Sequence, residues 1–257
     1  MNNPVVVIGM GEMGSVFARG FLRAGRPVYP VTRDSSPQQL FDKLQDKQLS
    51  EPEFVLVAVG EAALPEKLKS IPAQWHDRLV LLQNELLPRD WQDFPASTVI
   101  SVWFEKKKGM DSKVILPSPA FGKFATPLKD AMASIDIPVR TLNSANELLF
   151  ELVVKNLYIL TSNIAGLQVG GTVGTLWSQH RQVANDIVGD IIRLQEALTG
   201  QAFDNQALID AMLKAFEGDP DHKCMGRSAP ARLERALLLA EQLGLDLQAL
   251  KKIQQET

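Results

Sequence analysis

The chain has little cysteine, few histidines and no long apolar run. Its one cysteine, Cys224, cannot form a disulfide within the chain, so we expect a protein of the reducing cytoplasm. The three histidines show no metal-ligand spacing, and we expect no metal site. No apolar run approaches the ~18 residues that span a bilayer. The short apolar run before Gly9 follows no basic region, so it predicts a strand and not a signal peptide.

Charge of one sign is not in excess either. Lys and Arg number 27 against 30 Asp and Glu, and the net charge of −3 does not favour nucleic acid or an anionic membrane as a partner. The lysine run 106–108 is most simply a solvated hairpin tip. The composition is that of a soluble globular protein, and 257 residues suffice for two domains.

The most informative segment is residues 5–14, an apolar strand pattern that runs directly into G-x-G-x-x-G. In such a turn Gly9 permits the tight reversal, Gly11 lets the backbone approach a pyrophosphate, and Gly14 lets a helix pack close to the strand. The helix N-terminus that follows offers N–H groups to the phosphates. A plain strand–helix turn is the alternative, but the context predicts dinucleotide binding. The expected cofactor-binding residues are Gly9, Met10, Gly11, Glu12, Met13 and Gly14.

The end of the second expected strand, at residues 27–31, indicates which dinucleotide fits. An acidic residue there would accept the ribose 2′-OH of NAD, whereas an arginine accommodates the 2′-phosphate of NADP. The chain has Thr32 and Arg33 at this point, with the acidic Asp34 one place late, and then Ser35 and Ser36. We therefore expect Thr32 and Arg33 to bind NADP(H). A solvated arginine at a strand end is the alternative.

The spacing of the next elements predicts a shortened sheet. Pro30 cannot donate a ladder hydrogen bond, and proline belongs on sheet edges. Residues 37–47 look helical and the next strand pattern is 54–59, so little room remains for a third strand between them. We therefore expect the second strand at or near an edge. Two later strands are expected at 98–104 and 113–117.

Two continuous apolar runs, 54–59 and 79–82, predict strands buried on both faces. Ligands of open α/β sheets bind beyond the carboxyl ends of the strands. Gly60, Glu61 and Asn84 follow those ends, so we expect them in the cofactor region.

From about residue 144 the pattern is only helical. We therefore predict an α/β protein with a Rossmann-type parallel sheet domain at 1–143 and an all-helical domain at 144–257 for the substrate and for dimerisation. The expected helices are 145–164, 175–199, 204–217, 228–243 and 246–255.

Lys155 lies on the first of these helices. Taking ~100° per residue, Lys155, Ile159, Ser162 and Asn163 share one broad stripe of an otherwise apolar helix. Buried lysines shift their pKa readily, so a lysine here can act as a general acid or base. The alternative is a lysine whose amine reaches solvent.

These features together resemble the ketopantoate reductase family. A G-x-G-x-x-G domain precedes a helical domain whose first helix carries a lone lysine, and Arg33 has the spacing of that family's NADP-phosphate arginine. The segments that carry the resemblance, in the same order over most of the chain, are 7–15, 81–84, 155–167, 172–176 and 225–227.

The resemblance implies a fold, a cofactor and a reaction. The helical domain would be like the C-terminal domain of 6-phosphogluconate dehydrogenase. NADPH would pass a hydride to the ketone of a small 2-keto acid such as ketopantoate, in pantothenate biosynthesis, and Lys155 would protonate the new alkoxide. Asn84 and Asn163 would contact the substrate. The resemblance thus implies a small-molecule partner, a keto acid. The apolar faces of the C-terminal helices could equally fill the chain's own core or a homodimer interface, and periodicity does not separate the two.

The chain also departs from the family pattern. Gly60 and Glu61 stand where the family has a lysine, and Ile159 stands where it has an asparagine. Counted from Arg227, the substrate-positioning glutamate falls on Pro230. Glu234 lies one helical turn later and is the expected substitute.

These departures leave three functions open. The leading one is an NADPH-dependent reductase of a small 2-keto acid. An opine-type or imine-reducing dehydrogenase would share the two-domain layout. A non-catalytic NADP-binding protein would explain the departures from the family's substrate residues.

Overall fold

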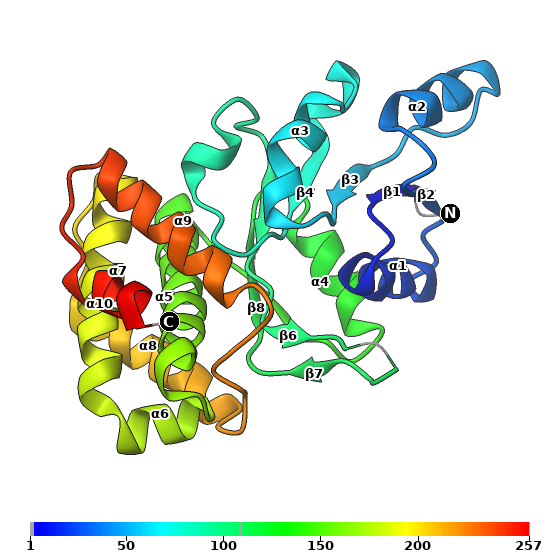
Figure 1. The fold of residues 1–257 in the computed structure, drawn as a ribbon. Helices are drawn as coiled ribbons and strands as arrows, with labels where there is room; N and C mark the ends of the chain where they lie inside the picture. The colour runs from blue at the N-terminus through cyan, green and yellow to red at the C-terminus, as the bar shows by residue number, and fades with distance from the viewer. Residues whose placement is uncertain (1–2, 108, 257) are drawn as a thin grey trace. The chain divides into compact units, whose positions relative to one another are not determined.

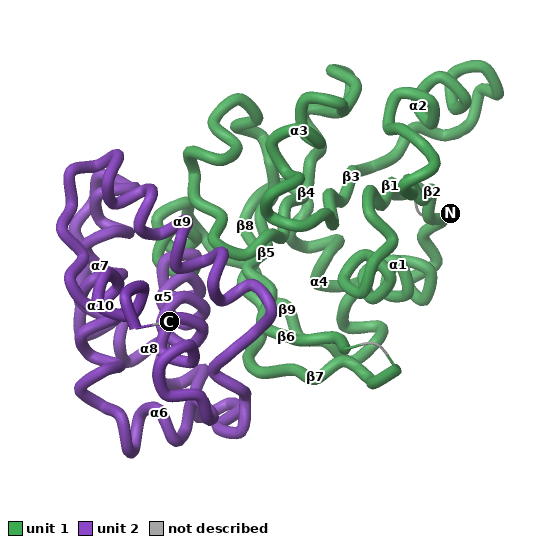
Figure 2. Tube along the Cα trace, viewed as in Figure 1, with its two compact units in different colours: residues 1–151 green, residues 152–257 purple. Residues whose placement is uncertain are grey.

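The computed structural model describes residues 3–107 and 109–256, and the chain forms two compact units (Figure 2). Unit 1 comprises residues 1–151 and unit 2 residues 152–257. The division lies inside the long helix α5 (Ala145–Val169). The boundary expected from the sequence, 143/144, lies just before this helix begins and stays a prediction.

Unit 1 is built on a seven-stranded sheet with the order β2-β1-β3-β4-β5-β8-β9 (Figure 1). β5 pairs with β8 antiparallel, and the other neighbours pair parallel. The strands are β1 (Val5–Ile8), β2 (Val28–Val31), β3 (Phe54–Val57), β4 (Leu79–Leu81), β5 (Thr98–Ile100), β8 (Ser118–Phe121) and β9 (Val139–Thr141). β1, β3 and β4 are fully buried, as their continuous apolar runs predict for strands covered on both faces.

Short helices connect and cover these strands. They are α1 (Glu12–Arg23), α2 (Pro37–Asp46), α3 (Leu64–Lys69) and α4 (Ala125–Ala133), with 3-10 turns η1 (Glu61–Ala63), η2 (Ala73–Arg78) and η3 (Pro88–Trp91). α1 packs against α4, where a Cβ on Gly20 would lie 3.0 Å from the carbonyl oxygen of Ala131. Aromatic rings fill the core beneath α1, with Phe21 and Phe54 in an edge contact at 5.4 Å.

The expected edge position of the second strand is confirmed, although the sheet as a whole has seven strands and is not short. β2 lies at the edge of the sheet and pairs with β1 alone among the described strands. Pro30 is exposed at this edge. It has no N–H group, and an edge position does not need one because no further described strand pairs on that side.

The single strand expected at 98–104 is wrong. β5 ends at Ile100, and a separate strand β6 (Phe104–Glu105) pairs antiparallel with β7 (Lys113–Val114). The ladder is interrupted because the N–H of Trp103 donates to the side-chain oxygen of Ser118, at 2.9 Å, and not to a backbone carbonyl. At the hairpin tip Lys107 is exposed, as expected, and Lys108 lies outside the described residues.

Unit 2 is helical. Besides most of α5, it contains α6 (Val173–Gln179), α7 (Arg181–Thr199), α8 (Asn205–Gly218), α9 (Ala229–Gln242) and α10 (Gln248–Glu256). The single helix expected at 175–199 is wrong, because the backbone of His180 leaves the helical region at φ −124° and ψ 35°. His180 still donates to the carbonyl of Leu176 and accepts from the N–H of Ala184, so it is bonded to both helices although its own backbone is not helical.

Helix α5 is apolar enough, by length and composition alone, to cross a membrane, which the sequence pattern did not lead us to expect. In the structure 83% of its most apolar window is buried inside the protein. Four of its polar residues, Asn156, Thr161, Ser162 and Asn163, are buried as well, and Asn156 donates to Gln195 of α7 at 2.9 Å. These are the properties of the core helix of a helical unit.

Candidate functional site

The glycine turn after β1 is shaped by close backbone contacts. Gly9 has φ +92°, and a Cβ on it would lie 2.5 Å from the carbonyl oxygen of Ala58. A Cβ on Gly14 would lie 1.8 Å from the carbonyl oxygen of Gly9. The chain therefore turns directly against the end of β3, and α1 starts in contact with the turn, as the motif predicts.

Gly11 differs from these two glycines. Its φ is −75°, and a Cβ on it would meet nothing within 4 Å among the described residues. The absence of a side chain at Gly11 is therefore not required by the packing of the protein itself. A ligand that lies against the backbone at Gly11 would leave no room for a side chain and so explains the glycine. The motif predicts a pyrophosphate at this position.

The helix that follows can receive an anion. Gly11 is the N-cap of α1, and no side chain caps that end. The 12-residue helix thus presents its first N–H groups and the positive end of its dipole. Glu12 and Met10 are exposed, whereas Met13 packs against the core.

The turn after β2 carries the residues expected to choose the cofactor. Thr32 and Arg33 are both exposed, and the N–H of Thr32 donates to the hydroxyl of Ser35 at 3.0 Å. Ser36 caps α2 through a capping box with Gln39. Parallel pairing brings the carboxyl ends of β1 and β2 to one edge, so Arg33 and the glycine turn belong to the same end of the sheet.

The carboxyl ends of β3 and β4 are joined by polar side chains. Gln83 is buried and its amide donates to the backbone oxygens of Val57 and Val59, at 2.6 and 3.2 Å. Asn84 donates to a carboxylate oxygen of Glu61 at 3.0 Å. Gly60 is exposed and precedes η1. The structure thus brings Asn84 and Glu61 together beyond the strand ends, as expected.

In unit 2, Lys155 lies on α5 with its amine 5.5 Å from the centre of the Tyr158 ring. Burial of the amine, and secondly the positive charge of Arg232, lower the pKa of Lys155 to about 7 from its ordinary 10.5. A lysine with this pKa holds and releases a proton near neutral pH, which is the property that a general acid requires.

Asn163 lies two turns further along α5, and it is buried at 7% exposure. Its side-chain oxygen accepts a 2.9 Å hydrogen bond from the guanidinium of Arg232, on α9. Arg232 therefore acts on both residues: it donates to Asn163, and its positive charge lowers the pKa of Lys155. The sequence patterns did not single it out.

A signal for Arg232 does exist in the sequence. Ala229, Leu233, Ala236 and Ala240 form the buried stripe of α9. Arg232 stands three residues after Ala229 and is only partly exposed, so it interrupts this stripe with a charge. A charged residue within an apolar stripe is a candidate for a functional or paired group.

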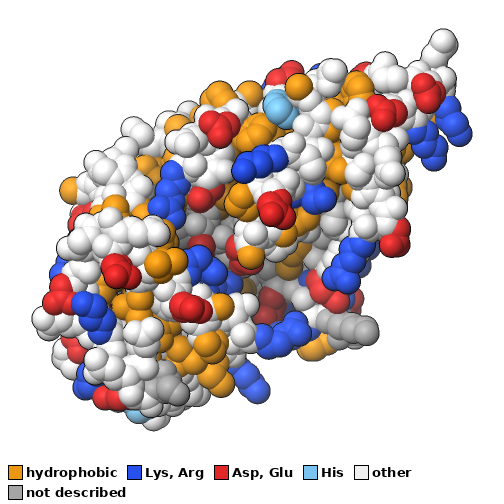
Figure 3. Space-filling model, turned by 45° about the horizontal axis from the view of Figure 1, so that its top comes forward, with side chains coloured by type: hydrophobic (Ala, Val, Ile, Leu, Met, Phe, Trp, Pro, Cys, Tyr) orange, Lys and Arg blue, Asp and Glu red, His pale blue; other side chains and the backbone are white. Residues whose placement is uncertain are grey.

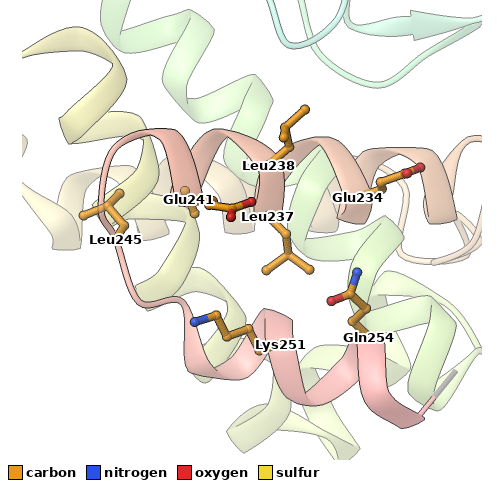
Figure 4. A pocket seen from close by; sticks show the side chains of 8 residues that line it. Glu234, Leu237, Leu238, Glu241, Leu245, Lys251 and Gln254 are labelled. Atoms are coloured by element: carbon orange, nitrogen blue, oxygen red, sulfur yellow. The ribbon is translucent and has the colours of Figure 1, made fainter.

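The structure does not bring Glu234 to Asn163. Glu234 is exposed and lies two residues after Arg232, about 200° around the helix at ~100° per residue. It lines a pocket of about 530 Å³ between α9 and α10, with Leu237, Glu241, Lys251 and Gln254 among its neighbours (Figure 4). We expected Glu234 to substitute for the family's substrate glutamate, and its placement does not support that role. Arg232, not Glu234, occupies the side of α9 that meets Asn163.

Charges elsewhere on the surface are mixed. On the face that Figure 3 shows, and among the side chains that the structure describes, acidic and basic groups alternate without an extended patch of one sign.

Comparison with known proteins finds similarity in structure only. No protein-family model matches the chain, and no curated protein sequence matches it. Among solved structures, the 2-dehydropantoate 2-reductase of Geobacter metallireducens GS-15 superposes with a TM-score of 0.67 at 13% identity, over 100% of both chains. The 2-dehydropantoate 2-reductase of Methylococcus capsulatus gives the same TM-score and identity over 98% of this chain and 94% of its own.

The chain has the fold of the ketopantoate reductases. A D-mandelate dehydrogenase, solved with NADH, is also similar, with a TM-score of 0.65 at 12% identity over 99% of this chain and 97% of the other. The predicted fold class, a largely parallel sheet followed by helices, is confirmed, and so is the resemblance at the level of the fold. At these identities the similarity concerns the fold.

Proposed function

We propose that this protein is an NADPH-dependent reductase of a small 2-keto acid, a divergent member of the ketopantoate reductase family. The observation that carries the proposal is Lys155, whose pKa of about 7 suits a proton donor at neutral pH. The expected product is the corresponding 2-hydroxy acid.

The glycine turn fits a dinucleotide. The close contacts at Gly9 and Gly14 and the open space around Gly11 are those of a cradle into which a Cβ would project. Gly9 to Gly14 would hold the pyrophosphate, and Thr32 and Arg33 the 2′-phosphate. Gly60 and Asn84 would lie along the cofactor at the next strand ends. When bound, the nicotinamide supplies the hydride that reduces the carbonyl carbon.

Lys155 would supply the proton. As the carbonyl carbon gains the hydride, negative charge develops on the oxygen, and an ammonium group beside it stabilises that charge. The proton then passes from the Lys155 ammonium to the alkoxide, which leaves a neutral amine and a hydroxyl group. Asn163 would contact the substrate from the same face of α5.

NAD in place of NADP is the competing cofactor assignment. The similar D-mandelate dehydrogenase was solved with NADH. In this chain the residue after β2 is Thr32, the next is Arg33, and an acidic residue, Asp34, comes only after it. Arg33, with Ser35 and Ser36 after Asp34, supports NADP.

A non-catalytic NADP-binding protein is the second candidate. Gly60, Ile159 and Pro230 replace side chains that the family resemblance would place in the substrate site. An opine-type or imine-reducing dehydrogenase is a third possibility, with the same layout.

The deciding experiment follows NADPH and NADH oxidation with a panel of 2-keto acids, ketopantoate and phenylglyoxylate among them. Wild type should oxidise NADPH with at least one acid, and Lys155→Ala should lower that rate by about 10²–10⁴-fold. NADPH binding without turnover of any acid would support the non-catalytic candidate. Turnover that needs an added amine would support the opine or imine candidate.

We also infer a cytoplasmic homodimer. One structurally similar ketopantoate reductase, from Staphylococcus aureus, is dimeric, with 15% identity over 98% of this chain and a TM-score of 0.61. Sedimentation at micromolar protein concentration tests the assembly.

A further inference from the structure

Arg232 is held in a defined orientation by α5. The guanidinium donates to the buried oxygen of Asn163 at 2.9 Å. Because the guanidinium is planar, this hydrogen bond also restrains the directions of its other N–H groups. The Arg232–Asn163 pair is therefore a preoriented cationic group.

The backbone that leads into α9 is also pressed against α5. A Cβ on Gly166 would lie 2.4 Å from the carbonyl oxygen of Cys224, and a Cβ on Gly226 would lie 3.4 Å from the Asn163 oxygen. The N–H of Cys224 donates to the carbonyl of Gly171 at 3.1 Å. Residues 224–226 thus follow the surface of α5 closely, and they set where α9, and Arg232 on it, begins.

The charged ends of Lys155 and Arg232 are near enough for their electrostatic fields to overlap. Lys155 lies eight residues before Asn163 on α5, about 12 Å along the helix axis at ~1.5 Å per residue. The long side chains of Lys155 and Arg232 can cover that distance between them. Arg232 is the charged residue whose field acts on the Lys155 ammonium. The two positive potentials therefore add between them, where an anion is most favourable.

We propose that Arg232, oriented by Asn163, binds the carboxylate of the substrate while Lys155 faces the adjacent carbonyl oxygen. In a 2-keto acid the carboxylate and the carbonyl are on neighbouring carbons, so one anion can engage both residues. Arginine recognises a carboxylate with two parallel hydrogen bonds, which lysine cannot reproduce. Arg232 is then a specificity-determining residue that favours 2-keto acids over neutral carbonyl compounds. This inference rests on the proposed reductase function.

The test compares a 2-keto acid with its primary amide, which keeps the carbonyl and loses the charge. Wild type should have a higher kcat/KM for the acid. Arg232→Gln should lower the acid-to-amide ratio of kcat/KM at least tenfold, chiefly through KM, and Arg232→Lys should restore part of it. Lys252→Gln, which removes an exposed charge from α10, is the control and should keep the ratio.

A binding measurement separates this inference from the proposed function. Oxamate resembles a 2-keto acid and accepts no hydride, and calorimetry with NADP⁺ present should show at least tenfold weaker oxamate binding to Arg232→Gln than to wild type. If wild type reduces a keto acid but Arg232→Gln keeps both the ratio and the oxamate affinity, the inference is overturned and the reductase stands. If no acid is reduced while oxamate binding depends on Arg232, the carboxylate site stands and the reductase fails. If wild type binds no oxamate and reduces nothing, both fail.

Discussion

The α-carbon of Gly14 faces the carbonyl oxygen of Gly9 so closely that a Cβ would lie 1.8 Å away. Gly14 is in the first turn of α1, and Gly9 is the residue after β1. This contact fixes how the helix leaves the strand. The turn itself is held in place, because the N–H of Gly9 donates to the carbonyl of Val31 at 2.9 Å.

Gly14→Ala should therefore destabilise unit 1. The backbone atoms that a methyl group would meet cannot swing aside as a flexible side chain can, and we expect a loss of about 2–3 kcal/mol in the free energy of unfolding, measured by urea titration. Gly189→Ala on α7 is the control, since a Cβ there meets nothing within 4 Å among the described residues. That control should be neutral or slightly stabilising. A Gly14→Ala variant as stable as wild type would contradict the backbone contact.

Gly11→Ala should separate binding from stability. A Cβ at Gly11 meets no described atom within 4 Å, so the free energy of unfolding should change by less than about 1 kcal/mol. Dinucleotide affinity, measured by the quenching of protein fluorescence, should fall at least tenfold, because the methyl group would occupy the approach to the pyrophosphate. Unchanged affinity would remove the cofactor explanation for this glycine.

Arg33→Ala should weaken NADPH binding far more than NADH binding. A charge-assisted hydrogen bond to a phosphate contributes about 1.5–3 kcal/mol, so the Kd for NADPH should rise about 10–100-fold. The Kd for NADH should change little, because NADH has no 2′-phosphate. Arg23→Ala, an exposed arginine in the last turn of α1, serves as the control. An equal loss for both cofactors would refute the NADP assignment.

The rate of reduction should depend on the protonation of Lys155. With its pKa lowered to about 7, the side chain carries a proton below pH 7 and loses it above. Because reduction needs the ammonium form, kcat/KM should fall about tenfold per pH unit above pH 7, and the reverse oxidation should rise over the same range. Lys155→Met should lose this pH dependence along with most of its activity. A flat wild-type profile between pH 6 and 9 would contradict Lys155 as the donor.

Lys155→Met should also stabilise the protein, most strongly in acid. The folded-state pKa of about 7 lies below the ordinary 10.5, so the folded state holds this proton less tightly than the unfolded state. The free-energy cost of keeping a charged Lys155 in the folded protein is therefore fully present below pH 7. It disappears as the pH rises toward 10.5, where the unfolded chain also loses the proton. We expect the free energy of unfolding of Lys155→Met to exceed that of wild type by about 2 kcal/mol at pH 6. This is less than the full ~1.4 kcal/mol per pKa unit, because the Lys155 side chain is partly exposed and solvent screens its charge. Urea titrations of both proteins at pH 6 and pH 9.5 should show the difference shrinking.

Most of the sheet unit could be predicted from local patterns, and the failures have physical causes. The continuous apolar runs identified β3 and β4, and Pro30 with the short spacing after it placed β2 at an edge. β8, α4 and β9 lay in a segment where short strands and a nine-residue helix leave too few turns for a clear period. The break at His180 interrupts the helix for a single residue, which is too short to disturb the helical period of the sequence.

The sequence by itself determined the glycine turn, the lone Lys155 and the order of sheet and helices, because these follow from local backbone requirements and from periodicity. Tertiary structure decided which side chain meets Asn163. Position in the sequence pointed to Glu234, but α9 packs so that Arg232 reaches Asn163 and Glu234 faces α10. Two residues on one helix point in opposite directions, and only the packing of that helix against its neighbours selects which of them meets α5.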